Sequence, residues 1–171
     1  SAYSVKRVRI SAQYERIAAE NVPAERVLDL SRRWGVELDR MEQYESATAG
    51  GVRLETLWPP GQSALASNDS GLVLKLTFAR RTILFPADIE APAQAELLQS
   101  RRALACDVLI APHHGSFEMT TGEFVDAVDP LYIVSSNDRT LSQRQRAFER
   151  TVPQRTLLRT NRCGAVAIVI E

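Results

Sequence analysis

The stretch that decides the fold is residues 81–136, which read RTILFPADIEAPAQAELLQSRRALACDVLIAPHHGSFEMTTGEFVDAVDPLYIVSS. Three apolar runs alternate here with two helical patterns: the runs are 83–85, 107–110 and 131–134, and the helices are 92–102 and 121–128. Continuous apolar runs are expected for strands that are covered by helices and buried on both faces. The alternation of strands and helices predicts an α/β fold with a largely parallel sheet.

Turn and cap residues extend this pattern toward both termini. A helix is predicted at 23–34, because proline stands at its first position and Gly35 follows it. Gly50-Gly51 predicts a turn into the strand 52–57, and Arg80-Arg81 a turn between the strands 72–79 and 82–85. The remaining predictions are a strand at 3–10, a short helix at 13–20, an extended segment at 36–44, a helix at 143–151, and strands at 155–159 and 165–170.

Composition describes an ordinary globular domain. Of 171 residues, 44% are hydrophobic, and 21 basic residues balance 21 acidic ones, so net charge gives no argument for nucleic-acid binding. Cys106 and Cys163 are far apart and form neither a disulfide framework nor a zinc motif. We expect a single domain over 1–171, with 1–60 as a helix-and-strand lead-in and 61–171 as the part that carries the site. The chain as given is expected to be soluble, because no apolar run reaches about 20 residues.

The candidate site residues follow the apolar runs. In covered parallel sheets, ligands bind beyond the carboxyl ends of the strands. Asp88 follows the first run, the adjacent His113 and His114 follow the second, and residues 135–138 follow the third. These are the chain's only two histidines, and each could instead be an ordinary surface residue, as Asp88 could be a helix cap. Together they predict a metal site, with three further candidates for phosphate or substrate contacts: Ser116, Ser135 and Asn137.

The chemistry of a divalent metal fits these side chains. A carboxylate can bridge two ions and an imidazole can complete a coordination shell. Two ions about 3.5–4 Å apart would activate water for phosphoryl displacement. Such a site needs more ligands than one aspartate and two histidines, and the chain contains no other histidine.

Three segments resemble the metallo-β-lactamase-like domain of the competence protein ComEC. They are NDSGLVL at 68–74, ILFPADIE at 83–90 and DVLIAPHHGS at 107–116. The closing Arg159-Thr160 and Gly164-Ala165-Val166 also resemble that family, and the likeness spans 22–171. The Pro-His-His-Gly-Ser piece is its most specific part.

This resemblance implies the C-terminal part of an αββα sandwich and a metal-dependent nuclease or phosphodiesterase that acts in DNA uptake during natural transformation. Asp88 would bridge the metals, and His113 or His114 would bind one ion. The cofactor would be zinc or manganese, with two sites in a complete domain. The implied partners are single- or double-stranded DNA and the membrane channel of a parent protein, which places the domain outside the bacterial inner membrane.

Three departures from the family pattern bear on catalysis. The family's histidine-rich motif, with most of its metal ligands, is not found within 1–171, and we expect it upstream of residue 1. Ala87 stands where the family has glycine before its aspartate. Residues 141–144, Leu-Ser-Gln-Arg, replace an expected His-Pro pair. A half-domain would also expose one face of its sheet, which a homodimer could cover.

Two alternatives keep the same fold. The chain could be a non-catalytic module that binds DNA or a partner, with phosphate contacts from arginines on its helices: Arg101, Arg102, Arg144, Arg146 and Arg150. It could also be a metallohydrolase that acts on a small ester or lactone, since such enzymes share these ligands.

Overall fold

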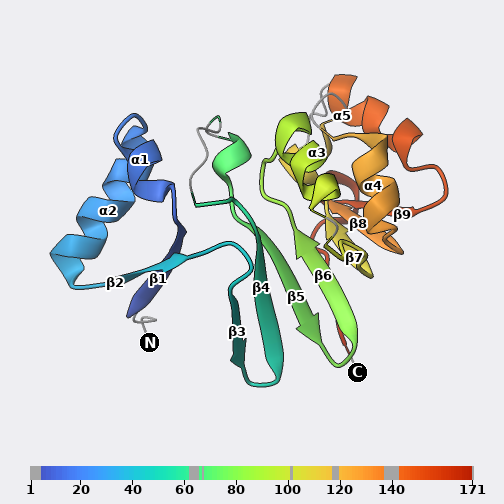
Figure 1. The fold of residues 1–171 in the computed structure, drawn as a ribbon. Helices are drawn as coiled ribbons and strands as arrows, with labels where there is room; N and C mark the ends of the chain where they lie inside the picture. Colours follow the sequence, from blue (N-terminus) through green and yellow to red (C-terminus); the bar gives the residue numbers. More distant parts are fainter. Residues whose placement is uncertain are drawn as a thin grey trace.

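A computed structural model describes residues 5–61, 66, 68–100, 102–116, 120–136 and 143–170, without the side chains of 144 and 145. The N-terminal unit (Figure 1) consists of β1 (Arg7–Ser11), α1 (Tyr14–Ala18), α2 (Val22–Trp34) and β2 (Glu37–Met41). Its two strands pair in parallel. The predicted helix ends as expected, because Gly35 adopts the left-handed conformation with φ 63°.

The main sheet has seven strands in the order β3-β4-β5-β6-β7-β8-β9. The strands are β3 (Ser46–Ala49), β4 (Val52–Trp58), β5 (Val73–Phe78), β6 (Arg81–Phe85), β7 (Val108–Ile110), β8 (Tyr132–Ser135) and β9 (Thr156–Arg159). Pairing is antiparallel from β3 to β6 and parallel from β6 to β9. The predicted α/β class is therefore confirmed, and the sheet begins before residue 61, because β3 and β4 belong to it.

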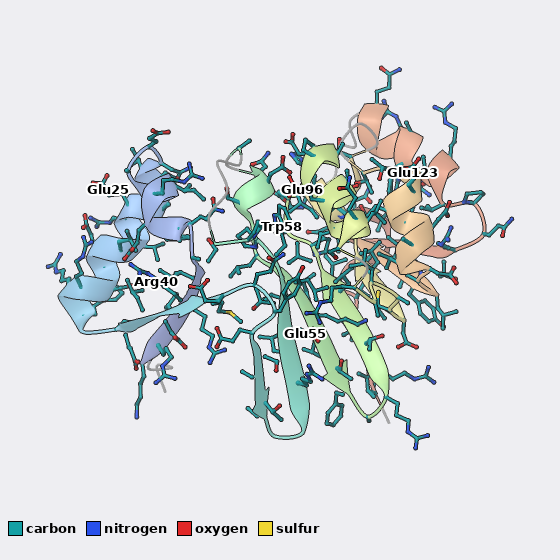
Figure 2. All side chains as sticks on the ribbon, viewed as in Figure 1. Glu25, Arg40, Glu55, Trp58, Glu96 and Glu123 are labelled. Atoms are coloured by element: carbon teal, nitrogen blue, oxygen red, sulfur yellow. The ribbon has the colours of Figure 1, made fainter. Side chains whose placement is uncertain are left out.

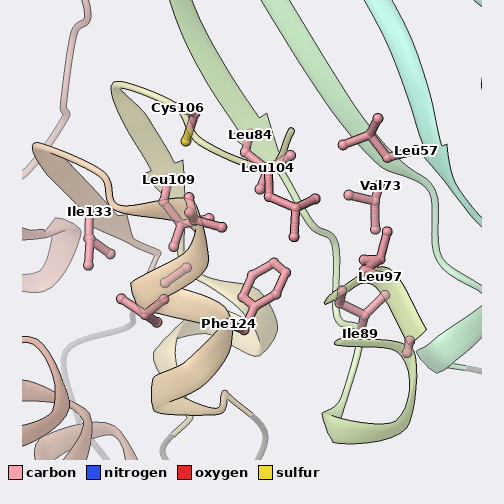
Figure 3. Packing of buried hydrophobic residues seen from close by; sticks show 14 of the residues in the cluster. Leu57, Val73, Leu84, Ile89, Leu97, Leu104, Cys106, Leu109, Phe124 and Ile133 are labelled. Atoms are coloured by element: carbon pink, nitrogen blue, oxygen red, sulfur yellow. The ribbon is translucent and has the colours of Figure 1, made fainter. Parts of the chain in front are cut away.

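Helices cover one face of this sheet (Figure 1). They are α3 (Ala91–Gln99), α4 (Gly122–Val128) and α5 (Gln143–Phe148), which continues into the 3-10 helix η3 (Glu149–Thr151). Phe124 and Leu97 pack against Leu84, Leu109 and other strand residues in the largest buried cluster (Figure 3). Burial of this apolar surface, at about 25 cal/mol per Å², is the main force that holds the helices on the sheet.

The second face of the sheet is apolar but has no helical cover among the described residues. Ile83, Val108 and Val134 form a separate cluster there, and Val166 packs against it. The strands were expected to be buried on both faces, and in the described part of the chain helices cover them on one face only. One sheet with one helical layer corresponds to half of an αββα sandwich.

The end of the chain differs from the prediction. A short helix, α6 (Thr160–Cys163), follows β9. Residues 165–170 were predicted to form a strand, but the structure has no strand there. Their alternation of small and branched apolar residues favours a strand, yet a strand exists only where a neighbour supplies hydrogen bonds. Instead this segment runs beside the open face and encloses with it a cavity of about 540 Å³.

Candidate metal centre

The candidate residues converge at one edge of the main sheet. Asp88 follows β6, and the 3-10 helix η2 (Pro112–Gly115) carries both histidines directly after β7. Because β6 and β7 are parallel neighbours, their carboxyl ends reach the same edge. The 540 Å³ cavity lies elsewhere, since it is lined by Arg81 and Asp107 from the opposite ends of these strands.

The backbone of the histidine loop has an uncommon conformation. His113, His114 and Gly115 have φ values of 46°, 58° and 78° in succession. The left-handed conformation costs a residue other than glycine about 1–2 kcal/mol, and such residues often occur at functional sites. Surrounding hydrogen bonds hold the loop in this form: His113 N donates to Ala87 O at 3.2 Å, and Ser135 Oγ donates to His114 O at 2.7 Å.

The turn directs the two imidazoles to different partners. Their rings are nearly perpendicular, at 84°, with centroids 6.4 Å apart. His114 Nε2 lies 3.8 Å from Asp88 Oδ1, whereas His113 Nε2 lies 4.0 Å from Glu90 Oε1. The structure therefore pairs His114, rather than His113, with the candidate aspartate.

His113 belongs to a second polar group. Asn68 Nδ2 donates to Glu90 Oε1 at 2.8 Å and lies 3.5 Å from His113 Nε2. The side chains of His113 and Glu90 are both about one third exposed, at 32% and 29%. This group fixes the orientation of the His113 ring beside the Asp88–His114 pair.

Asp69 supports the loop that carries Asp88. The Asp69 side chain is buried, and its Oδ1 accepts a hydrogen bond from Glu90 N at 2.7 Å. Its backbone carbonyl accepts from Trp58 Nε1 at 2.6 Å, and Trp58 stands at the end of β4 (Figure 2). Neither Asn68, Asp69 nor Glu90 was a sequence candidate. The available signal was the polar run Asn68-Asp69-Ser70-Gly71 before a strand.

Other candidates lie nearby in different settings. Ser135 is 1% exposed, and its hydroxyl donates a hydrogen bond to the backbone carbonyl of His114. Ser116 is 8% exposed, at the end of the histidine loop. Asn137 lies outside the described residues, as do Leu141 and Ser142 from the departure at 141–144. A substrate role for any of these serines or for Asn137 stays a prediction.

The donor set fits part of a metal site. Bonds of about 2.0–2.2 Å from one ion to an imidazole and a carboxylate can span up to about 4.2 Å between donor atoms, so the 3.8 Å pair can share an ion. Both side chains are half exposed, at 54% and 49%, and therefore accessible. The described residues contain no group of three or more His, Cys, Asp or Glu that could hold an ion. Asp88 and His114 thus fit as two ligands of a metal site.

Comparison with known proteins relates the chain to competence proteins. It is 25% identical over 112 residues to the ComE operon protein 3 of Bacillus subtilis, covering 66% of the chain and 14% of that protein. It is 30% identical over 88 residues to the competence protein ComA of Neisseria gonorrhoeae, covering 51% of the chain and 13% of that protein. Over these stretches the chain is similar to ComEC-type competence proteins. It spans only about one seventh of the length of these relatives, and no family model matches it.

Solved structures that are similar to the chain include those of two proteins. One is named a "putative Zn-dependent hydrolase of the metallo-β-lactamase superfamily" from Thermotoga maritima, with a TM-score of 0.46, 14% identity and 72% of each chain covered. The other is CmlA, a diiron β-hydroxylase from Streptomyces venezuelae, with a TM-score of 0.42 and 17% identity over 60% of the domain and 26% of that chain. In the described part of the domain, no helix is long and apolar enough to span a membrane.

Proposed function

We propose that this domain contributes two ligands, Asp88 and His114, to the metal site of a nuclease or phosphodiesterase that acts in DNA uptake. The observation that carries the proposal is the 3.8 Å approach of Asp88 Oδ1 and His114 Nε2, across the carboxyl ends of parallel strands, in a relative of competence proteins. A bound zinc or manganese ion would supply Lewis acidity and an activated water. In that role the domain would lie outside the inner membrane, with DNA as its substrate and a membrane channel as its partner.

The chain's own residues prepare this site without the metal. The left-handed turn aims the two imidazoles apart, so that His114 meets Asp88 and His113 meets Glu90. Hydrogen bonds from Ser135 and from His113 N fix the loop, and Asp69 fixes the segment that carries Asp88. Because these contacts fix the loops, Asp88 and His114 would lose little conformational freedom on binding an ion. This supports their assignment as metal ligands.

The proposal is tested by metal titration of the whole chain with Zn²⁺ and Mn²⁺. We expect Asp88→Asn and His114→Gln each to weaken binding by about tenfold or more, and His113→Gln to weaken it less. The control is Glu25→Gln on α2 (Figure 2), an exposed carboxylate in the N-terminal unit, which should leave binding unchanged. Equal affinities of the wild type and the Asp88 and His114 variants would overturn the ligand assignment.

Substrate class is tested separately with a labelled DNA strand in the presence of Mn²⁺. Cleavage that EDTA stops and that Asp88→Asn abolishes would support the nuclease. Turnover of esters or lactones without phosphodiester cleavage would instead support the small-substrate alternative. Salt-sensitive DNA binding with no metal-dependent cleavage would support the binding module.

A further inference from the structure

Helix α2 carries a second row of apolar residues beside its buried face. The buried face holds Ala24 and Leu28, which pack against α1 and β2. The second row follows spacings of four, three and four residues, which place side chains on one side of a helix. It lies roughly a quarter of a turn from the buried face. We call this row the outer stripe, and it consists of Pro23, Val27, Leu30 and Trp34.

The outer stripe is open to solvent. Trp34 is 70% exposed and Val27 is 37% exposed, while Pro23 is exposed and Leu30 is partly buried. Helix α2 forms the outer side of the N-terminal unit, away from the main sheet (Figure 1). Single exposed apolar residues are normal, but a contiguous apolar row with a polar border marks an interaction surface. The stripe is therefore a candidate contact surface.

Basic side chains border the outer stripe on the side away from the buried face. They are Arg26 and Arg33, which are seven residues apart and both exposed. Within the described residues, neither guanidinium has an ion-pair partner. Of the two acids on α2, Asp29 pairs with Arg32 at 3.3 Å, and Glu25 lies on the opposite side of the helix from the stripe. The border of the stripe is therefore positively charged.

The end of α2 extends this pattern. Lys6 O accepts a hydrogen bond from Glu37 N at 3.0 Å, and Glu37 comes three residues after Trp34. The segment before β1 therefore reaches this end of the helix, where it adds Lys6, which is exposed, and Val5, which is 59% exposed. The Glu37 carboxylate is already paired, with Arg7 at 2.9 Å. Apolar and basic side chains thus occur together at this end as well.

This combination selects among the possible partners. A coiled-coil partner helix would place charged rows on both sides of its apolar seam, but one side of the outer stripe is the core of the N-terminal unit itself. A nucleic-acid strand stacks successive bases on several aromatic side chains, and Trp34 is the only aromatic residue of α2. Tryptophan, aliphatic side chains and arginines in one row instead suit a lipid surface with anionic headgroups.

We infer that the outer stripe of α2 is a membrane-contact surface that rests on anionic lipids. Trp34 and Val27 enter the headgroup region, and Arg26 and Arg33 meet the lipid phosphates. Binding of this kind adds the burial of apolar side chains to the attraction between cations and an anionic surface, so both parts contribute. The inference does not rest on the proposed function, because it uses no residue of the candidate metal centre.

The test follows the tryptophan fluorescence of the whole chain as lipid vesicles are added. The vesicles contain phosphatidylcholine and phosphatidylglycerol in equal amounts, or phosphatidylcholine alone. The chain has two tryptophans, and only Trp34 can report contact with lipid, because Trp58 is 2% exposed. We expect the emission to shift to shorter wavelength with the mixed vesicles, to change little with phosphatidylcholine alone, and to recover as salt screens the attraction.

Variants assign the binding to the outer stripe when it is measured by sedimentation with the mixed vesicles. Trp34→Ala should weaken binding by about tenfold or more, and Arg33→Gln by about fivefold. Two matched controls should bind as the wild type does. Tyr132→Ala removes an aromatic side chain that is 48% exposed on β8, and Arg80→Gln removes an exposed arginine between β5 and β6. Identical circular dichroism spectra confirm that the variants are folded.

Several results would overturn the inference. One is no sedimentation of the wild type with the mixed vesicles, and another is equal binding to both kinds of vesicle. Equal losses in Trp34→Ala and Tyr132→Ala would show that a different surface meets the lipid. A fluorescence shift with a thymidine oligonucleotide but not with vesicles would assign the stripe to nucleic acid. A shift that grows with protein concentration, without vesicles and without vesicle binding, would assign it to a second copy of the chain.

Discussion

Ala87 lies directly against Gly71: a Cβ atom on Gly71 would be 3.0 Å from the Cβ of Ala87. Ala87 also has a φ of 53°, in the left-handed region. The loop before β5 and the loop that carries Asp88 therefore meet without room for a second methyl group. This contact explains why glycine suits both positions, and why the alanine at position 87 is a strained departure from the family pattern.

Ala87→Gly should stabilise the domain. Removing the methyl relieves about 1–2 kcal/mol of left-handed strain, while the added freedom of the unfolded chain costs about 0.4–1 kcal/mol. The free energy of unfolding should rise by about 0.5–1 kcal/mol, seen as a higher urea midpoint at an unchanged slope. Ala95→Gly, at an exposed position within α3, is the control and should lower stability by about 1 kcal/mol. A lower stability of the Ala87→Gly variant would contradict the prediction that the backbone of Ala87 is strained.

Gly71→Ala should lower stability by about 1–3 kcal/mol, because the new methyl meets Ala87 Cβ at 3.0 Å and Asn68 O at 3.2 Å. Ala87→Gly in the same chain should restore part of this loss, since it removes one of the two contacts. A double-mutant cycle in urea would give the coupling energy, expected at about 0.5 kcal/mol or more. Simple additivity of the two changes would show that the loops do not press on each other.

Gly115→Ala should destabilise the histidine loop severely. The added methyl would lie 2.6 Å from Ser135 Oγ and 3.1 Å from Phe148 Cδ1, at a φ of 78°. Gly35→Ala separates the two causes, because Gly35 has a φ of 63° but no atom within 4 Å of the new methyl. We expect a loss of about 1 kcal/mol for Gly35→Ala and about 3 kcal/mol or more for Gly115→Ala. If Gly35→Ala and Gly115→Ala lowered stability by similar amounts, the left-handed backbone conformation alone would explain the need for glycine at position 115.

Sequence patterns located the strand ends but not the contacts between them. Asp88 and the histidines were predicted from three apolar runs, because the period of a buried strand is visible in the sequence. His114, and not His113, approaches Asp88 because two consecutive residues adopt the left-handed conformation. The residue types at 113–114 do not predict this conformation. Asn68, Asp69 and Glu90 were missed for a similar reason, since their partners lie 21 to 45 residues away.

The predicted strand at 165–170 shows the limit of local propensity. The segment Ala-Val-Ala-Ile-Val-Ile has the residues of a strand. Pairing, however, depends on a neighbour with free backbone groups, and in the described chain this segment is not paired as a strand. The unpredicted β3 is the converse case, because a polar Ser-Ala-Thr-Ala run becomes a strand through its pairing with β4.

Asp107 should make the stability of the domain depend on pH. Partial burial acts to raise the pKa of its carboxyl, but hydrogen bonds from Thr82 and the Arg81 guanidinium outweigh this and lower the pKa below 3.8. A carboxyl whose pKa is lowered on folding stabilises the protein above the unfolded pKa, and this contribution is lost as pH falls through the folded value. Urea unfolding should therefore show a loss below about pH 4.

Asp107→Asn should remove this acid dependence. In the wild type, Thr82 N donates to Asp107 Oδ2 at 2.8 Å, and the asparagine side chain keeps one oxygen that can accept this hydrogen bond. The substitution removes the ion pair between Asp107 and Arg81. We expect a cost of about 1–2 kcal/mol at neutral pH, which shrinks as the pH is lowered. A difference between wild type and variant that stays constant from neutral to acid pH would contradict the assignment. Asp39→Asn, at a surface pair with Arg9, is the control and should change stability by less than about 1 kcal/mol.

Asp69→Ala should affect both stability and metal binding, because Asp69 Oδ1 holds Glu90 N at the start of α3, two residues after Asp88. Loss of this acceptor should cost about 1–2 kcal/mol, and the freed loop should weaken Zn²⁺ or Mn²⁺ binding by about tenfold or more. Asp69→Asn keeps the acceptor oxygen and should recover most of both losses. Asp29→Ala removes an exposed carboxylate from the i,i+3 pair with Arg32 and should leave metal binding unchanged. If Asp69→Ala lowered stability but metal affinity stayed at the wild-type value, Asp69 would support the fold alone, and Asp88 would be positioned by other contacts.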